Sequence, residues 1–376
     1  MWRIIPAADD SVMVGVRPFA SQRSPLNDDV VAGSNQSRPH PVECGAPPQP
    51  RARAMSTSDA FANLRSFIAA RIIGQSRLVD RLLIALLADG HLLVEGAPGL
   101  AKTRAIKVLG EGLEGDFHRI QFTPDLLPAD LTGTEIYRPQ DGSFKFQQGP
   151  LFHNLVLADE INRAPAKVQS ALLEAMAERQ ITIGRETYHL PELFLVMATQ
   201  NPLEQEGTYP LPEAQLDRFL MHVTVSYPAH DEERQVLALA REEARQSLRH
   251  AQPPAAVLSQ ALVFEARRDV LSVHMSEALE HYLLALVFAT RDPSPFGSDL
   301  AQWVQYGASP RATLALDRCA RAHAWLRGRD YVNPEDIQGI APDVLRHRVI
   351  LNYEAAAEGV TPDRFVDTLL ARVPVP

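Results

Sequence analysis

The sequence predicts an α/β protein with a five-stranded parallel sheet, followed by an all-α C-terminal domain. Between residues 60 and 227, short apolar runs bounded by turn or polar residues alternate with helical patterns. Continuous apolar strands are typical of parallel sheets that helices cover on both faces. After residue 227 the apolar runs stop, and the rest of the chain shows helical patterns only. The second domain is therefore predicted to be helical.

The elements follow in order along the chain. A helical pattern covers about residues 61–90, where apolar residues repeat on one stripe. Five apolar runs then predict strands at 91–95, 118–122, 155–159, 194–199 and 221–226. Helical patterns between these runs include 103–112 and 166–178. The C-terminal helices are expected at 231–245, 264–270, 276–290, 309–327, from 333–336 onward, at 342–350 and at 361–371.

Composition divides the chain into three regions. Residues 1–54 hold 8 of the 29 prolines and show no sustained periodicity, so they are expected to be a disordered tail or a mis-assigned start before Met55. Residues 55–228 are predicted to form the α/β core, and residues 229–376 the helical domain. A chain of this length allows two such domains with a sizeable buried core.

Charge and cysteine content exclude several classes of protein. The formal net charge is −9, so the overall field does not favour non-specific binding to nucleic acid or anionic lipid. The chain has two cysteines without metal-ligand spacing, and no apolar run approaches the ~20 residues of a membrane span. A reducing, cytoplasmic location is the expectation, without a structural zinc.

A phosphate-binding loop follows the first predicted strand. The loop is Gly96, Ala97, Pro98, Gly99, Leu100, Ala101, Lys102 and Thr103, and a helical pattern follows it. Glycines allow backbone N–H groups to point at phosphates, while the helix N-terminus and Lys102 add positive charge. Thr103 is expected to place its hydroxyl on Mg²⁺. One departure is Ala101, which stands where a glycine often precedes the lysine.

Two carboxylates end the strand predicted at 155–159. Asp159 is expected to hold Mg²⁺ through water, and Glu160 to polarise the attacking water. A helix N-cap is the alternative for such a pair, but the phosphate loop upstream favours the catalytic interpretation. The adjacent acids also argue against a GTPase switch, which generally uses Asp-x-x-Gly.

Asn201 follows the strand predicted at 194–199. A polar amide there can reach between the γ-phosphate and the attacking water. Asn201 and Pro202 together are also an ordinary turn initiator, so this residue in isolation favours a structural role.

These motifs together resemble the AAA+ ATPases, and longer strings resemble the MoxR family in particular. The resemblance covers about residues 60–373, and its strings occur in order: 96–103, 121–128, 159–164, 198–202 and 209–219. Ala101 is consistent with this resemblance, because the phosphate loop of the family typically contains the sequence Leu-Ala-Lys-Thr.

The resemblance implies further residue roles. Arg218 resembles the arginine finger that reaches the γ-phosphate of a neighbouring subunit, and Arg311 resembles sensor 2 at the start of a lid helix. Ile73, Gly74 and Gln75 resemble the segment that lines the adenine pocket. Residues 123–150 and 179–190 look like hairpin insertions that project toward the pore of a ring, with plain surface hairpins as the alternative.

The resemblance implies an ATP- and Mg²⁺-dependent, chaperone-like remodeller of protein clients. It also implies a homo-oligomeric ring, expected to be a hexamer, and a partner with a von Willebrand factor A domain. The alternatives are a nucleic-acid motor, which the net charge disfavours, and the motor subunit of a metal chelatase. A nucleotide sensor without turnover is disfavoured because the predicted catalytic residues are all present.

Overall fold

The computed structural model describes residues 56–202, 207–247 and 258–376 of the chain. Residues Ala54–Pro376 form one compact unit. The expectation for residues 1–54 concerns a segment outside the described residues. The predicted domain boundary near residue 228 falls inside the compact unit, where the last strand of the sheet leads into the first C-terminal helix.

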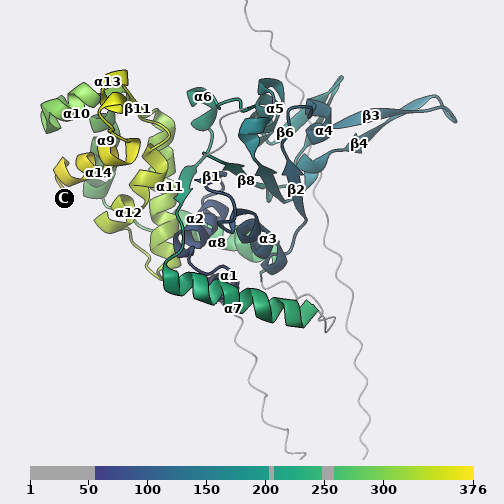
Figure 1. The fold of residues 1–376 in the computed structure, drawn as a ribbon, viewed down its shortest axis with the longest axis horizontal. Coiled ribbons are helices and arrows are strands. Elements are labelled where there is room, and N and C mark those ends of the chain that lie inside the picture. The colour runs from purple at the N-terminus through teal and green to yellow at the C-terminus, as the bar shows by residue number, and fades with distance from the viewer. Residues whose placement is uncertain (1–55, 203–206, 248–257) are drawn as a thin grey trace, which may run out of the picture. The chain divides into compact units, whose positions relative to one another are not determined.

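A five-stranded parallel sheet forms the centre of the fold, as the sequence predicts (Figure 1). Its strand order is β2-β5-β8-β1-β9, and all neighbouring strands run parallel. The bounds are β1 Leu92–Gly96, β2 Phe117–Gln121, β5 Leu155–Asp159, β8 Leu195–Gln200 and β9 Met221–Val225. Because the strands are parallel, the segments that follow β1, β5 and β8 all begin at one edge of the sheet.

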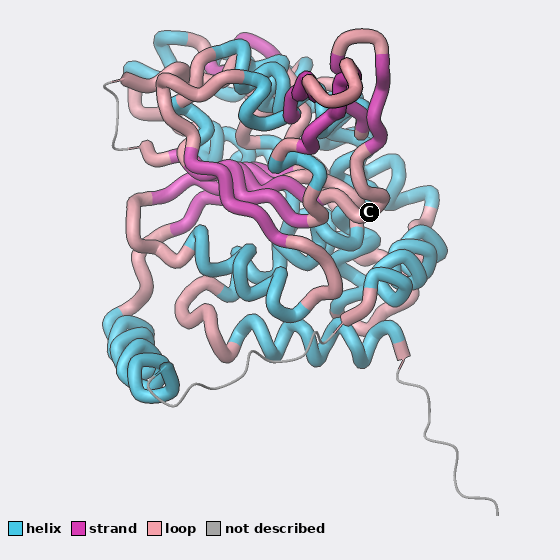
Figure 2. Tube along the Cα trace, turned by 90° about the vertical axis from the view of Figure 1, so that its right-hand side faces the viewer, coloured by secondary structure: helices cyan, strands magenta, loops and turns pink. Residues whose placement is uncertain are grey.

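Helices cover both faces of this sheet (Figure 2). On β5, Leu155 and Leu157 pack into the same core as the first three helices, whereas Val156 and Ala158 pack with α5 on the other side. Every second strand residue therefore faces a different helical layer, which explains why the strands read as unbroken apolar runs. The helices of the core are α1 Thr57–Ala69, α2 Ser76–Leu87, α3 Lys102–Gly112, α4 Pro128–Thr132, α5 Ala166–Glu178 and α6 Glu213–Leu216, and 3₁₀ turns occur at Pro150–Phe152 and Ile161–Arg163.

The single helical pattern expected over residues 61–90 is wrong, because two helices occupy it. α1 ends at Ala69 and α2 begins at Ser76. Between them Gly74 has a φ of 76°, in the left-handed region that glycine adopts readily. Both helices bury their apolar stripes in the same core, so the periodicity continues across the break and does not reveal it.

Helices make up most of the C-terminal region, together with one short ladder. The helices are α7 His230–Ser247, α8 Gln260–Ser272, α9 Glu277–Arg291, α10 Ser298–Trp303, α11 Pro310–Leu326, α12 Pro334–Leu345, α13 Tyr353–Ala357 and α14 Pro362–Arg372, with a 3₁₀ turn at Ser294–Phe296. The strands β10 Val304–Tyr306 and β11 Ile350–Leu351 pair antiparallel, which the sequence did not predict.

The separate helix expected at 342–350 is wrong. Pro342 lies inside α12, which continues through it and ends at Leu345. Beyond that end, Arg346 donates to the carbonyl oxygen of His222 at 2.5 Å and Arg348 donates to that of Phe219 at 2.6 Å. These bonds hold residues 346–348 against the start of β9, and the chain then enters β11.

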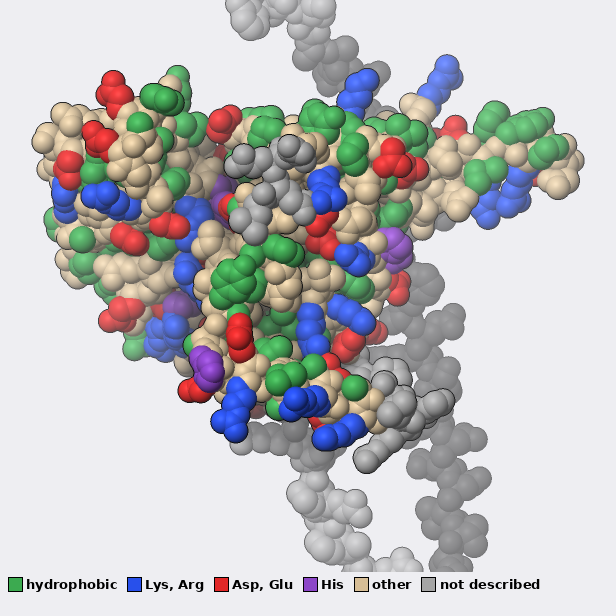
Figure 3. Space-filling view, viewed as in Figure 1, with side chains coloured by type: hydrophobic (Ala, Val, Ile, Leu, Met, Phe, Trp, Pro, Cys, Tyr) green, Lys and Arg blue, Asp and Glu red, His purple; other side chains and the backbone are tan. Residues whose placement is uncertain are grey.

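Two hairpins occupy the predicted insertions. The strands are β3 Gly133–Arg138, β4 Ser143–Gln148, β6 Gln180–Ile183 and β7 Glu186–His189. The ring of Phe146 stacks on that of Tyr188 with centroids 4.1 Å apart, which joins the two hairpins. Ile136, Tyr137 and Phe144 are exposed on the β3–β4 hairpin, and Figure 3 shows apolar side chains gathered on this projecting element.

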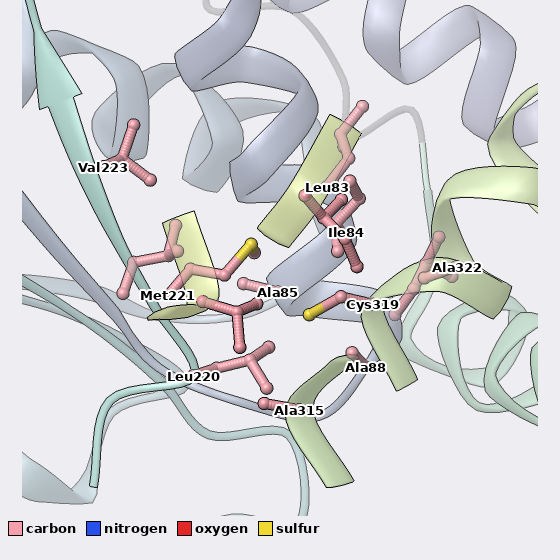
Figure 4. Packing of buried hydrophobic residues seen from close by; sticks show 14 of the residues in the cluster. Leu83, Ile84, Ala85, Ala88, Leu220, Met221, Val223, Ala315, Cys319 and Ala322 are labelled. Carbon is pink, nitrogen blue, oxygen red and sulfur yellow. The ribbon is translucent and has the colours of Figure 1, made fainter. Parts of the chain in front are cut away.

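The C-terminal helices pack directly on the core (Figure 4). Leu83 of α2, Met221 of β9 and Cys319 of α11 belong to one buried cluster. Cys319 is fully buried, and burial raises the pKa of its thiol to about 12, so it is a small apolar core residue.

A buried carboxylate joins the same two regions. Asp343 of α12 is fully buried and accepts from Arg81 Nε at 2.6 Å, from Arg77 Nη2 at 2.8 Å and from Arg346 Nη1 at 2.7 Å. Arg77 and Arg81 lie on α2. Removing one partner from such a buried ion pair is strongly unfavourable, so this network fixes α12 against the core.

His91, just before β1, is expected to make stability depend on pH. Its Nδ1 accepts from Val196 N at 3.0 Å, and its Nε2 lies 3.2 Å from the carbonyl oxygen of Met176, so the neutral ring satisfies both contacts. Burial lowers the pKa of His91 to about 4. Because an unfolded histidine titrates near pH 6.5, the unfolded state takes up a proton first, and the free energy of unfolding falls as the pH drops from about 6.5 to about 4.

At pH 5 this histidine should lower the free energy of unfolding by about 2 kcal/mol relative to pH 7. Urea unfolding of the wild type and of His91→Gln at both pH values measures this change in the free energy of unfolding, because the variant lacks the titrating ring. The same pH dependence in both proteins would show that His91 is not responsible.

Candidate active site

The phosphate loop connects β1 to α3. Gly96 ends β1, and Lys102 and Thr103 begin α3. Gly99 has a φ of 84°, and nothing lies within 4 Å of the position of an added Cβ, so this turn of the loop faces open space. Ala101, the N-cap residue of α3, has a φ of 58°. This conformation turns the chain into the helix and leaves the α3 N-terminus at the edge of the sheet, where backbone N–H groups can bind phosphate.

Lys102 is already held between two strand ends. Its Nζ donates to the carbonyl oxygen of Gly96, and to that of Gln200 at 3.3 Å. These carbonyls close β1 and β8, which are neighbours in the sheet. The ammonium group is therefore placed beside the loop at the edge where a bound phosphate would need a positive charge.

Asp159 lies across from the hydroxyl of Thr103. Thr103 Oγ1 is 3.5 Å from Asp159 Oδ2, so the structure brings together the two residues that the sequence assigned to Mg²⁺. The other carboxylate oxygen, Oδ1, accepts from Thr199 Oγ1 at 2.6 Å. Arg119 of β2 binds Oδ2 through Nη2 at 2.7 Å and Nε at 3.1 Å.

Glu160 has a φ of 58° and lies at the same edge. Its backbone N–H donates to Thr199 Oγ1 at 2.9 Å, so one threonine fixes both acidic residues. Its side-chain Oε2 accepts from Gln121 Nε2 at 2.8 Å and from Arg163 Nε at 3.1 Å. The carboxylate is thus hydrogen-bonded and oriented by neighbouring side chains of the same chain.

Three residues that contact the acidic pair were not predicted from the sequence: Thr199, Arg119 and Gln121. A signal existed for two of them, because Arg119 and Gln121 are exposed polar residues on either side of the buried Ile120 in β2. Their partners could not be predicted, because that requires knowing that β2 pairs with β5 and places Gln121 opposite Asp159.

Asn201 and the segment 73–75 also lie at this end of the core. Asn201 is buried and directly follows Gln200, whose carbonyl oxygen binds Lys102. Gln75 Nε2 donates to the carbonyl oxygen of Ser226 at 3.0 Å. An added Cβ on Gly74 would lie 2.8 Å from Pro228 Cβ, so the backbone of this segment runs close to the connection between β9 and α7. Ile73 is half-buried beside it.

The two remaining predicted residues, Arg218 and Arg311, lie at the opposite edge of the sheet. The backbone N–H of Leu220 donates to the carbonyl oxygen of His91 at 2.8 Å, so residues 217–220 lie beside the start of β1, whereas the phosphate loop follows its end. Arg311 Nη1 donates to Asp217 Oδ2 at 3.3 Å. The structure therefore brings the two arginines together, away from the phosphate loop of the same chain.

Asp217 organises this second cluster. Its Oδ2 also accepts from Ser309 Oγ at 2.9 Å, and Ser309 is the N-cap residue of α11. Its Oδ1 accepts from Arg348 Nε at 2.8 Å. One pocket is lined by five arginines, Arg179, Arg218, Arg311, Arg318 and Arg348, and by two carboxylates, Asp89 and Asp217. The guanidinium groups outnumber the carboxylates, so the pocket has an excess of positive charge that suits an anionic ligand.

Known proteins share this arrangement of core and lid. Residues 91–221 match the ATPase family associated with various cellular activities (AAA), and residues 299–369 match the AAA lid domain. Chaperone MoxR1 of Mycobacterium tuberculosis is 47% identical over 309 residues, which cover 81% of this chain and 79% of that protein. The chain belongs to the MoxR family of AAA+ ATPases.

Two further proteins of this kind are similar over most of their length. Protein MoxR of Paracoccus denitrificans is 35% identical over 336 residues, which cover 85% of this chain and 98% of that protein. A crystal structure from Cytophaga hutchinsonii superposes with a TM-score of 0.78 at 47% identity, covering 85% of this chain and 96% of that one. The predicted family and the predicted α/β core with a helical lid are therefore confirmed, and the chain is an ATPase.

The residues of this AAA+ site fit a magnesium ion. Mg²⁺ is usually held by one or two carboxylates together with substrate phosphates, rather than by an all-protein cage. The residues that the structure describes contain no group of three or more His, Cys, Asp or Glu side chains that could hold a metal ion by themselves. Thr103 and Asp159 provide hard oxygen atoms 3.5 Å apart next to the phosphate loop, which is the donor set that Mg²⁺ with ATP requires.

No helix within residues 56–202, 207–247 and 258–376 has the length and apolar character needed to cross a membrane.

Proposed function

We propose that this ATPase hydrolyses ATP with Mg²⁺ at sites shared between neighbouring copies of the chain. The observation that supports it is the separation of the predicted catalytic groups. Lys102, Asp159 and Glu160 lie at the carboxyl edge of the sheet, and Arg218 and Arg311 at the opposite edge. The five residues of β1 span about 16 Å, too far for these arginines to reach a nucleotide on their own loop.

A shared site implies a directional assembly. The phosphate-loop face of one copy would meet the arginine face of the next, and such head-to-tail contacts close into a ring when the rotation allows it. We propose a hexamer, as the family resemblance implies.

We also propose a domain boundary near residue 228, between β9 and α7, and a cytoplasmic location for the assembly.

Within one copy, the phosphate loop and its neighbours bind and orient the nucleotide. Backbone N–H groups of Gly96–Thr103 and the ammonium of Lys102 bind the β- and γ-phosphates. Thr103 and Asp159 would hold Mg²⁺, which neutralises charge on the phosphate oxygens. Glu160 polarises the attacking water, Asn201 senses the γ-phosphate, and Ile73, Gly74 and Gln75 line the adenine pocket.

The neighbouring copy completes the site. Arg218 would approach the γ-phosphate and stabilise the charge that builds up in the transition state. Arg311 lies beside it through Asp217, so we propose that sensor 2 also acts on the neighbour's nucleotide. Asp217 contacts both Arg311 and Arg348, which holds the start of α11 next to the arginine finger.

The proposed substrate of the motor is a protein. Phe144 is 67% exposed and Tyr137 is 54% exposed on the β3–β4 hairpin, and apolar side chains of this kind can contact a polypeptide. The M. tuberculosis relative is named a chaperone. The net charge of −9 disfavours nucleic acid as the substrate. We further propose that a partner with a von Willebrand factor A domain helps to select the client.

ATP turnover by the full chain tests the shared site. The rate of phosphate release per chain should rise with protein concentration in step with the assembled fraction measured by light scattering, and EDTA should abolish it. Single- or double-stranded DNA at low salt should not change the rate. A rate per chain that stays constant for a monomer would overturn the shared site, and strong stimulation by DNA would overturn the protein client.

A further inference from the structure

Arg119 occupies the carboxylate oxygen that faces the proposed metal site. Asp159 Oδ2 is the atom 3.5 Å from Thr103 Oγ1, and the same atom accepts from Arg119 Nη2 at 2.7 Å and from Nε at 3.1 Å. Asp159 Oδ1 is turned the other way and accepts from Thr199 Oγ1 at 2.6 Å. The oxygen available to a cation beside Thr103 is therefore already bound to a guanidinium.

The surroundings allow Arg119 to leave. Its side chain is 51% exposed, whereas that of Asp159 is 10% exposed. A half-exposed guanidinium on an edge strand can turn out into water, but the buried carboxylate would then need another cation in its place, because an unpaired buried charge is unfavourable. The carboxylate has no such freedom, since Thr199 holds it and the end of β5 buries it. Of the two side chains, that of Arg119 is the one with room to move.

A second contact orients Arg119 while it is bound to Asp159. Its Nη2 also donates to Gln121 Oε1 at 3.0 Å, on the same face of β2. The guanidinium is thus oriented from its own strand and directed at Asp159 across the β2–β5 pairing. The register of the β2–β5 pairing therefore places the positive charge of Arg119 next to Asp159.

We propose that Arg119 is a positioning residue that covers Asp159 Oδ2 until Mg²⁺ arrives with the nucleotide, and thereby lowers the affinity of the site for Mg²⁺. Two cations cannot both approach one carboxylate oxygen without repulsion. Without metal, Arg119 neutralises Asp159 and holds it in the orientation that Thr103 and the metal require. This inference rests on the magnesium site of the proposed function.

Titrating Mg²⁺ into the full chain that holds a fluorescent ADP, with protein in excess, measures the metal directly and without turnover. In Arg119→Gln the Mg²⁺ concentration at half-saturation should fall about tenfold, because one positive charge near the metal is removed. Arg119→Lys keeps the charge but loses the paired N–H groups, and should lie between Arg119→Gln and the wild type.

Arg163→Gln is the matched control, because it removes the same charge from Glu160 and leaves Asp159 unchanged. We expect a change below about threefold there, since separated exposed charges are screened. An unchanged or weaker Mg²⁺ affinity in both Arg119 variants would overturn the inference. Failure of the wild type to bind the nucleotide at all would instead overturn the proposed function. Thermal unfolding of each variant confirms that the fold is retained.

Discussion

Replacing Glu160 by glutamine is expected to reduce ATP turnover by about 10²–10⁴-fold while the protein still binds ATP. The amide has nearly the shape of the carboxylate but cannot polarise water in the same way. The backbone contact from Glu160 N to Thr199 does not depend on the side chain, so the strand end and Asp159 should stay in place. Steady-state phosphate release and the affinity for a fluorescent ATP measure the two effects separately.

Glu174→Gln is the matched control for this variant. Glu174 is exposed on α5 and undergoes the same chemical change away from the phosphate loop. Its turnover should equal that of the wild type. If Glu160→Gln retains turnover within about threefold of the wild type, a general-base role for Glu160 is ruled out.

Replacing Arg218 by alanine should lower turnover by about 10³-fold without weakening ATP binding. Arg218 lies at the edge of the sheet opposite the phosphate loop, where its Nη1 donates to the carbonyl oxygen of Leu173 at 3.0 Å. In the proposed shared site, its loss should therefore leave the nucleotide contacts of its own chain intact and remove charge stabilisation from the neighbouring site. Phosphate release and nucleotide affinity, measured at a concentration where the ring is assembled, test this expectation.

Mixing the two variants separates a shared site from a self-contained one. An interface that combines Glu160 from an Arg218→Ala copy with Arg218 from a Glu160→Gln copy is complete. Random assembly at equal amounts should restore about a quarter of the wild-type turnover. Arg311→Ala should be rescued in the same way. Arg268→Ala, which removes an exposed arginine of α8, is the control for loss of charge. Absence of rescue at every mixing ratio would argue that Arg218 does not act across an interface.

Much of the fold is predictable because it depends on local patterns. Each strand of the central sheet lies within one residue of its predicted apolar run. Helix boundaries were less predictable where the deciding contact is distant. Gly74 lies between α1 and α2 and packs next to Pro228, in the connection that follows β9. Arg346 and Arg348, just after the end of α12, bind carbonyl oxygens near β9.

The sequence by itself predicts the phosphate loop and the chemistry proposed for it, because strand, loop and helix are contiguous and Lys102 and Thr103 follow the glycines at fixed spacing. It also placed Asp159 and Glu160 at the end of a strand. Only the tertiary structure decided what surrounds them. Arg119 meets Asp159 because β2 pairs with β5, and Arg311 joins Arg218 because α11 begins beside residue 217. Both contacts depend on how distant segments pack, and no local pattern in the chain encodes that.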